Sequence, residues 1–259
     1  MFSSKDLLNS LVVERMLAGV ATRRHGDVAE PLGEKVESRA TATSKSAISR
    51  RFVAATNKAL EELMARSLCD LEVAVLMIDG LEVAGQCCVV ADGTKVPVGL
   101  WLGDTENKTV VTALLADLVA RGLATDSGVL CVIDGAKALA AGINKVFGET
   151  AVVQRCVLHK RRNLAGYLPK ELASTVDRRL AVIFAQPDAD KGHDAARRLA
   201  NELEADHPNA AASLREGLED MFTVRRLGTS GNLARTLTNT NCIESMISVA
   251  RRTTRRVTR

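Results

Sequence analysis

The sequence has few aromatic residues: five phenylalanines, one tyrosine and one tryptophan, or 3% of its 259 residues. Proteins that bind nucleic acid by stacking its bases present several aromatic side chains for that purpose. We therefore expect phosphate contacts, rather than base stacking, to dominate any binding of nucleic acid. The single tryptophan, Trp101, closes an apolar run and is expected to lie in the core.

The sequence also lacks the cysteine pattern of a disulfide framework and the long apolar run of a membrane span. Its six cysteines lie mostly inside apolar stretches at irregular spacings, which is typical of reduced, buried thiols. No stretch approaches the roughly 18 to 20 apolar residues that cross a bilayer, and the first residues do not resemble a secretory signal. We expect a soluble, cytoplasmic protein with no membrane partner.

Neither sign of charge is in large excess. The formal net charge is +4, from 35 Lys and Arg against 31 Asp and Glu, but the cations are clustered. Residues 150–169 contain no acid, and residues 251–259 are rich in arginine. The basic residues of these two segments are Arg155, Lys160, Arg161, Arg162, Arg251, Arg252, Arg255, Arg256 and Arg259. Basic patches of this kind attract a phosphate backbone. For the second segment, a solvated charged helix is the alternative.

Two apolar runs end on an aspartate that is followed by glycine. Residues 73–78 precede Asp79, and residues 130–133 precede Asp134. Such runs predict buried strands, and ligands bind outside the carboxyl ends of strands in open α/β sheets. Two carboxylates at one sheet edge repel each other unless a cation lies between them, and Mg2+ prefers oxygen ligands. The alternative is a simple turn after each strand, because Asp and Gly are common in turns.

The hydrophobic patterns predict an α/β fold. The predicted strands are residues 73–78, 87–91, 95–101, 130–133 and 151–154, and the predicted helices between them are residues 109–121 and 136–146. An Asp-Gly pair at residues 92–93 predicts a hairpin between the second and third strands. Three successive antiparallel strands, a helix and then parallel strands are the order of an RNase H-like core.

Helices predominate on both sides of this core. Apolar spacing and prolines predict a helical insertion with helices at residues 170–185, 189–205 and 209–221. Near the N-terminus, a helix at residues 7–17 and a second one that begins after residue 41 and ends near Leu68 resemble a helix-turn-helix. The alternative there is a pair of amphipathic helices with a solvated basic face. The predicted domains are residues 1–68 (helical, DNA-binding), 69–155 (RNase H-like core), 156–236 (helical insertion) and 237–259 (C-terminal helix with a basic tail).

Four segments resemble the Mutator-type transposases of bacterial insertion sequences. They are Met77–Gly80, Val132–Lys137, Val153–Asn163 and Thr238–Ser248, and they occur in the order found in the family. The segments Asp92–Lys95 and Leu100–Asn107 agree with the family as well. The resemblance extends from about Ser44 to Arg259. The hairpin near Asp92 is shorter than in the family, and relatives continue past the position of Arg259, so we expect a C-terminally truncated member.

The resemblance implies a DDE transposase that cleaves DNA 3′ ends and transfers the strands. The catalytic and metal-binding residues would be Asp79, Asp134 and Glu244, with two Mg2+ or Mn2+ ions. The partners would be the terminal inverted repeats of the element, target DNA and further copies of the chain, as a homodimer or higher oligomer near the nucleoid. The expected DNA-binding residues are Ser46, Ser49, Arg50, Arg51, Arg155, Cys156, His159, Lys160, Arg161, Arg162, Arg251 and Arg252.

Local sequence leaves other interpretations open at two of these positions. The spacing of Asn241 and Glu244 is that of a capping box, in which the glutamate only closes a helix end. Cys156 and His159 have the spacing of half a zinc site, but structural zinc needs four ligands, so a structural or DNA-contacting role is expected instead. Two other functions stay open: an RNase H-like nuclease without transfer activity, and an inactive DNA-binding protein that occupies transposon ends.

Overall fold

The computed structural model describes residues 5–18, 24, 44–81, 86–91, 96–102 and 107–254. Its contacts divide the chain into two units. The larger unit is Ser67–Ser245, and the smaller one combines Met1–Arg66 with Met246–Arg259. Each unit is described by itself.

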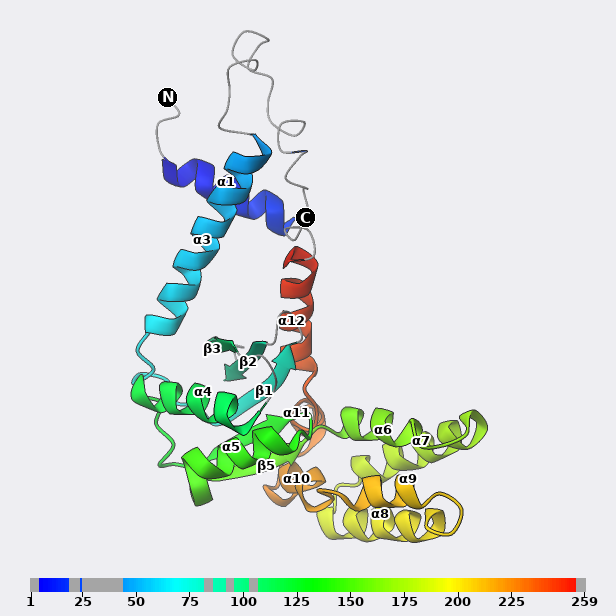
Figure 1. The fold of residues 1–259 in the computed structure, drawn as a ribbon. Coiled ribbons are helices and arrows are strands. Elements are labelled where there is room, and N and C mark those ends of the chain that lie inside the picture. Colours follow the sequence, from blue (N-terminus) through cyan, green and yellow to red (C-terminus); the bar gives the residue numbers. More distant parts are fainter. Residues whose placement is uncertain are drawn as a thin grey trace. The chain divides into compact units, whose positions relative to one another are not determined.

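A five-stranded mixed sheet forms the centre of the larger unit (Figure 1). Its strands are β1 (Val75–Leu81), β2 (Gln86–Ala91), β3 (Val96–Leu102), β4 (Val129–Ile133) and β5 (Ala151–Arg155), in the order β3-β2-β1-β4-β5. β2 pairs antiparallel with β1 and β3, whereas β4 pairs parallel with β1 and β5. All five residues of β4 are buried, as expected of an apolar strand inside a parallel pairing.

Two helices pack on this sheet and complete its core. They are α4 (Lys108–Ala120) and α5 (Lys137–Phe147), and the 3-10 turn η3 (Gly148–Thr150) follows α5. Asn107 begins α4, because its side chain accepts hydrogen bonds from the backbone N–H groups of Thr109 and Val110. Leu114 and Leu118 of α4 join Ile78 of β1 and Ile133 of β4 in one buried cluster. The α/β class predicted from the sequence is confirmed, and Trp101 packs against this core as expected.

The chain from β5 onward is helical, and α6 to α9 form a group of their own in Figure 1. The elements are α6 (Val157–Ala165), α7 (Lys170–Ala185), α8 (Ala189–Leu203), α9 (Pro208–Arg215), the 3-10 turn η4 (Glu219–Met221), α10 (Thr223–Arg226), α11 (Gly231–Leu237) and α12 (Asn241–Thr254). The part of this segment from α6 to Phe222, the residue after η4, has its own apolar core, which also includes Leu180 and Leu199. The buried Gln154 on β5 joins this segment to the sheet, since its side chain donates to the Met221 carbonyl and accepts from the Val224 N–H.

The predicted helix at residues 209–221 is wrong in its second half. Helix α9 ends at Arg215, because Gly217 adopts a φ of 64° that a helix does not allow. A Cβ at Gly217 would overlap the guanidinium of Arg155, so the backbone approaches that side chain closely there. A single glycine inside an apolar pattern does not by itself mark a helix end in the sequence.

In the smaller unit, α1 (Lys5–Leu17) packs on α3 (Lys45–Ala65) through Val12, Met16, Ile48 and Phe52. Ser44 caps α3, since its hydroxyl accepts a hydrogen bond from the Ala47 N–H. Both predicted helices are therefore present, although α3 ends three residues before the predicted Leu68. None of the helices in the described part of the chain is both long and apolar enough to span a bilayer. The predicted hairpin turn at residues 92–93 lies outside the described residues.

Candidate functional site

Two aspartates lie side by side at one edge of the sheet. β1 and β4 run parallel, with Ile78 paired to Ile133, and each aspartate is the next residue of its chain segment. Asp79 is 8% exposed. The expectation that β1 ends at Ile78 is wrong, because Asp79 and Gly80 continue to pair with β2. A turn therefore does not explain the Asp-Gly pair at Asp79.

Asp134 does form a turn, directly after β4. One carboxylate oxygen accepts a hydrogen bond from the Ala136 N–H at 2.9 Å. Gly135 between them has a φ of 112°, which L side chains rarely adopt. The turn holds the carboxyl group of Asp134 next to the sheet edge. The position therefore fits both a simple Asp-Gly turn and a carboxylate that binds a cation.

Glu244 reaches the same region from the first turn of α12. Its Oε1 accepts a hydrogen bond from the Thr240 hydroxyl at 2.9 Å and lies 3.8 Å from His159 Nδ1. Its other oxygen lies 3.9 Å from the Arg162 guanidinium. The capping-box alternative does not describe this geometry, because the Asn241 N–H donates to Asn239 Oδ1 and not to Glu244.

The three acids share one electrostatic environment. Burial, followed by the negative charge of Asp134, raises the pKa of Asp79 to about 6. Glu244 adds a smaller effect in the same direction, and His159 opposes it. A carboxyl group whose pKa is raised this far is less stable as a carboxylate anion than it is in water. A nearby cation stabilises the anion and lowers the pKa again.

Thr240 is fully buried, and its hydroxyl joins Glu244 to a cysteine–histidine pair. The Thr240 oxygen lies 3.4 Å from Cys156 Sγ and 3.3 Å from His159 Nδ1. Burial by itself raises the pKa of the Cys156 thiol, but hydrogen bonds with His159 and Thr240 outweigh it and lower that pKa below its usual value. The same contact with Cys156 raises the pKa of His159.

Metal ligands of two kinds are therefore close together. In the described part of the chain, Cys156, His159 and Glu244 are the group whose ligand atoms all lie within 4.8 Å of one another. The Thr240 hydroxyl already hydrogen-bonds within this group, and the set has three ligands where structural zinc takes four. Asp79 and Asp134 lie outside this group, although the Asp79 carboxyl group interacts electrostatically with both Asp134 and Glu244. Carboxylate oxygens are ligands that hard cations prefer.

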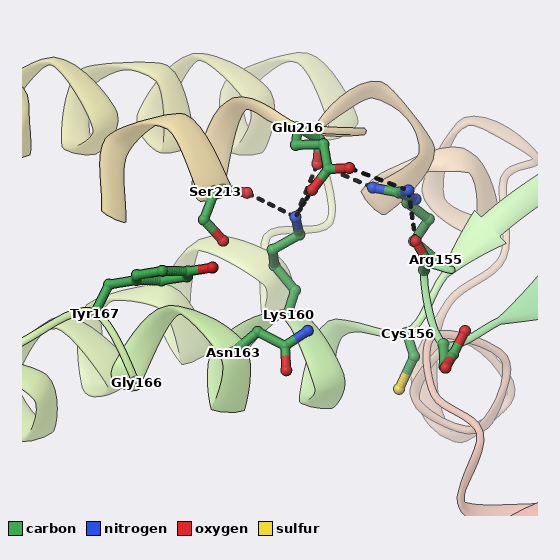
Figure 2. A pocket seen from close by; sticks show the side chains of 10 residues that line it. Arg155, Cys156, Lys160, Asn163, Gly166, Tyr167, Ser213 and Glu216 are labelled. Carbon is green, nitrogen blue, oxygen red and sulfur yellow. Dashed lines mark hydrogen bonds and ion pairs between the residues drawn. The ribbon is translucent and has the colours of Figure 1, made fainter. Parts of the chain in front are cut away.

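Two cations predicted to contact DNA are instead bonded to backbone carbonyls of the protein, Arg155 from β5 and Lys160 from α6 (Figure 2). Lys160 is buried and donates to the carbonyls of Ser213 and Glu216, at 2.6 and 2.8 Å. Arg155 is also buried and donates to the carbonyls of Gly135 and Glu216. The positions of Arg155 and Lys160 do not support the predicted phosphate contact, because both side chains are occupied by protein oxygens. The absence of acids in residues 150–169 gave no indication that their partners come from residues 213–216.

The other basic residues of this segment differ from each other. Arg161 makes a two-pronged ion pair with Asp177, with both nitrogen–oxygen distances at 2.7 Å. Arg162 is 61% exposed beside Glu244. Arg162 is therefore the cation of α6 that can meet a phosphate next to the acids without losing a buried partner.

The remaining predicted DNA-binding residues lie in the smaller unit. Ser46 and Arg50 are exposed in the first turns of α3, and Ser49 and Arg51 are half-buried there. Arg251 and Arg252 are part of helix α12, but the structure describes only their backbone and not their side chains. That these residues contact DNA stays a prediction.

Thr240 is the residue of this site that the sequence patterns missed. It lies four positions before Glu244, the spacing at which two side chains meet on one helix face. That spacing is common, so it indicates contact but not function.

Comparison with known proteins identifies relatives along nearly the entire chain. The sequence model of a family described as "Transposase, Mutator family" matches residues 3–259. The chain is 28% identical to the transposase for insertion sequence element IS256 in transposon Tn4001 of Staphylococcus aureus, over 96% of this chain and 64% of that protein. It is 31% identical to the transposase for insertion sequence element IST2 of Acidithiobacillus ferrooxidans, over 64% of this chain and 55% of that protein. The chain thus spans less than two thirds of the length of these curated relatives.

Proposed function

Since the chain belongs to the Mutator family of transposases, we propose that it cleaves DNA at the ends of an insertion sequence and transfers the strands to target DNA. The observation that carries the proposal is that Asp79 and Asp134 lie at one sheet edge with Glu244 of α12 nearby, and that burial, followed by the charges of the other two acids, raises the pKa of Asp79. On this proposal the sheet, with its order β3-β2-β1-β4-β5, is an RNase H-like core that carries a DDE site.

The three acids bind Mg2+ or Mn2+, two ions in all, on this proposal. When bound, such a pair activates the attacking oxygen and stabilises the leaving oxygen of a phosphodiester. Support comes from the chemistry of the donors: three carboxylates, one of them buried and raised in pKa by its neighbours. Asp79 lies on the central strand β1, and its carboxyl group interacts with both other acids, so it would be one of the residues that hold the ions.

The chain's own side chains hold these acids in place. The backbone turn after β4 orients Asp134, and the Thr240 hydroxyl orients Glu244. Arg162, exposed and 3.9 Å from Glu244, is placed to contact a phosphate of the bound strand. His159 lies between Cys156 and Glu244 and lowers the negative charge of the site when it is protonated.

The first turns of α3 recognise the terminal repeat, through Ser46, Ser49, Arg50 and Arg51. Base-edge contacts specify a sequence, whereas phosphate contacts only position the protein. Changes at Ser46 and Arg50 should therefore reduce the preference for the repeat. A homodimer or higher oligomer would hold the two ends of the element together.

The test is an assay of the purified chain on labelled duplexes that carry the terminal repeat, with Mg2+ and target DNA. We expect cleaved ends and strand-transfer products, and we expect EDTA to abolish both. Asp79→Asn, Asp134→Asn and Glu244→Gln should each abolish cleavage and leave DNA affinity unchanged or slightly improved. Asp70→Asn, which alters an exposed acid before β1, is the matched control and should cleave normally.

Other outcomes would replace the proposal with one of the alternatives. Cleavage without transfer products would indicate a nuclease. A shift of the duplex without cleavage would indicate a DNA-binding protein. Cleavage by the aspartate variants within about tenfold of the parent chain would rule out these acids as metal ligands.

A further inference from the structure

A cavity of about 290 Å3 opens next to Asp134, between α6, α9 and the turn after β4 (Figure 2). Tyr167, Asn163 and Lys160 form one side of it, and Ser213 and Glu216 form the other. Asp134 belongs both to this pocket and to the acidic edge of the sheet. A molecule bound at the acids could therefore place one of its own groups in this pocket.

The charges in the pocket do not favour an anion. The amino group of Lys160 is surrounded by two carbonyl oxygens and the Glu216 carboxylate, which is 3.9 Å away. Arg155 is likewise held by two carbonyls and lies 4.0 Å from the same carboxylate. With Asp134 and Glu216 facing these two cations, the pocket is close to neutral. A phosphate would have to displace these protein partners, whereas a neutral polar group would not.

Three polar side chains that line this neutral pocket make no hydrogen bond within the described part of the chain. Tyr167, the single tyrosine of the chain, is 54% exposed here. In the part of the chain that the structure describes, the Tyr167 hydroxyl, the Asn163 amide and the Ser213 hydroxyl have no hydrogen-bond partner. The amide and the two hydroxyls can each donate and accept, and the tyrosine ring offers a flat apolar face. Together they match a flat, neutral ring with polar edges.

We propose that this pocket receives one unstacked DNA base, from a nucleotide that adjoins the phosphate cut at the acids. The inference rests on the proposed function, since the proposed cleavage is what brings DNA to Asp134. The base stacks on Tyr167, and its edge hydrogen-bonds to Asn163 and Ser213. A base inside a duplex cannot reach the pocket, so binding requires that one nucleotide be turned out of the stack. One such base leaves phosphate contacts as the main source of affinity.

The test is a double-mutant cycle between Tyr167 and single bases of the DNA. Equilibrium binding of the full chain is measured without divalent metal, on a terminal-repeat duplex with one abasic nucleotide placed in turn at each position within three of the cleaved phosphate. On the intact duplex, Tyr167→Ala should weaken binding by roughly 5- to 150-fold, the range for loss of one stacked base. On the duplex that lacks the recognised base, the same variant should differ from the parent by less than about twofold. Tyr167→Phe keeps the ring and should bind as the parent does.

The position of Tyr167 makes this cycle interpretable. The side chain is largely exposed, so its removal does not empty the core, and Val182→Ala, at an exposed residue of α7 outside the pocket, serves as the control. An effect of Tyr167→Ala that is equal at every abasic position, or no effect at all, would overturn the inference. Because binding is measured without metal, these results do not depend on cleavage: a chain that cleaves but shows no coupling refutes the pocket alone, and a chain that never cleaves refutes the proposed function.

Discussion

Replacement of Thr240 by valine tests whether the buried hydroxyl positions Glu244. The two side chains have nearly the same shape, and Thr240 is fully buried, so the substitution removes the hydroxyl without opening a cavity. The hydroxyl's shortest contact is the hydrogen bond of 2.9 Å to a Glu244 oxygen, and its longer contacts with Cys156 and His159 are lost with it. A hydrogen bond to a charged group contributes about 1.5 to 3 kcal/mol, and the partial exposure of Glu244 favours the lower end of that range. We therefore expect DNA cleavage to slow about tenfold.

The assay is single-turnover cleavage at several Mg2+ concentrations, with thermal unfolding recorded for each variant. A loosely held metal ligand raises the Mg2+ concentration that gives half-maximal rate, whereas a general loss of folding lowers the rate at every concentration. Thr236→Val is the matched control, because that exposed hydroxyl donates only to the Asn232 carbonyl on the same helix. If Thr240→Val cleaves within twofold of the parent when Mg2+ is limiting, the hydroxyl does not position Glu244.

Three further predictions concern stability. In urea titrations, Gly217→Ala should lower the free energy of unfolding by at least ~1 kcal/mol more than Gly228→Ala. Both glycines have a positive φ, which costs an alanine roughly 1–2 kcal/mol. Only at Gly217 would the new methyl group also overlap the buried side chain of Arg155. Lys160→Met should lower the same free energy by about 1 to 3 kcal/mol, because the buried amino group's hydrogen bonds to the Ser213 and Glu216 carbonyls are lost and only the Glu216 carbonyl keeps a second donor, Arg155; an unchanged urea midpoint would contradict this. In the folded chain the pKa of Asp177 lies below its usual 3.8, so the ion pair with Arg161 stabilises the fold above about pH 4, and this stabilisation is lost as the pH falls through the folded pKa. Since the pair is partly exposed, it should contribute no more than about 1 kcal/mol. Between pH 7 and pH 3, the melting temperature of Asp177→Asn should therefore fall less than that of the parent chain.

The sheet and the placement of its two aspartates were predictable because they depend on local pattern. Short apolar runs that are rich in β-branched residues identified the strands, and parallel neighbours bring their carboxyl ends to one edge. The extent of β1 was not predictable in the same way. Its pairing with β2 carries the strand through Asp79 and Gly80, which local preferences assign to a turn.

The surroundings of the acids depended on contacts between distant parts of the chain. The sequence predicts DNA contact for Lys160 and Arg155 because no acid is near them in sequence, yet both side chains donate to carbonyls of residues 213–216. Backbone carbonyls carry no signature in a sequence, so such partners cannot be found from composition. Thr240 escaped notice for a related reason: a threonine four residues before a glutamate is ordinary until a cysteine and a histidine from α6 are packed against it.

The position of α12 has a consequence for the order in which the site comes into being. Asp79 lies on β1 and Asp134 directly follows β4, whereas Glu244 comes about 110 residues after Asp134, a stretch that takes on the order of 5 to 20 s to translate. During that interval a nascent chain on the ribosome holds a sheet with two of the three acids. On the proposed mechanism it is harmless to DNA near its own gene, and the ability to cut arises only after α12 has been synthesised and Glu244 has packed beside the other acids.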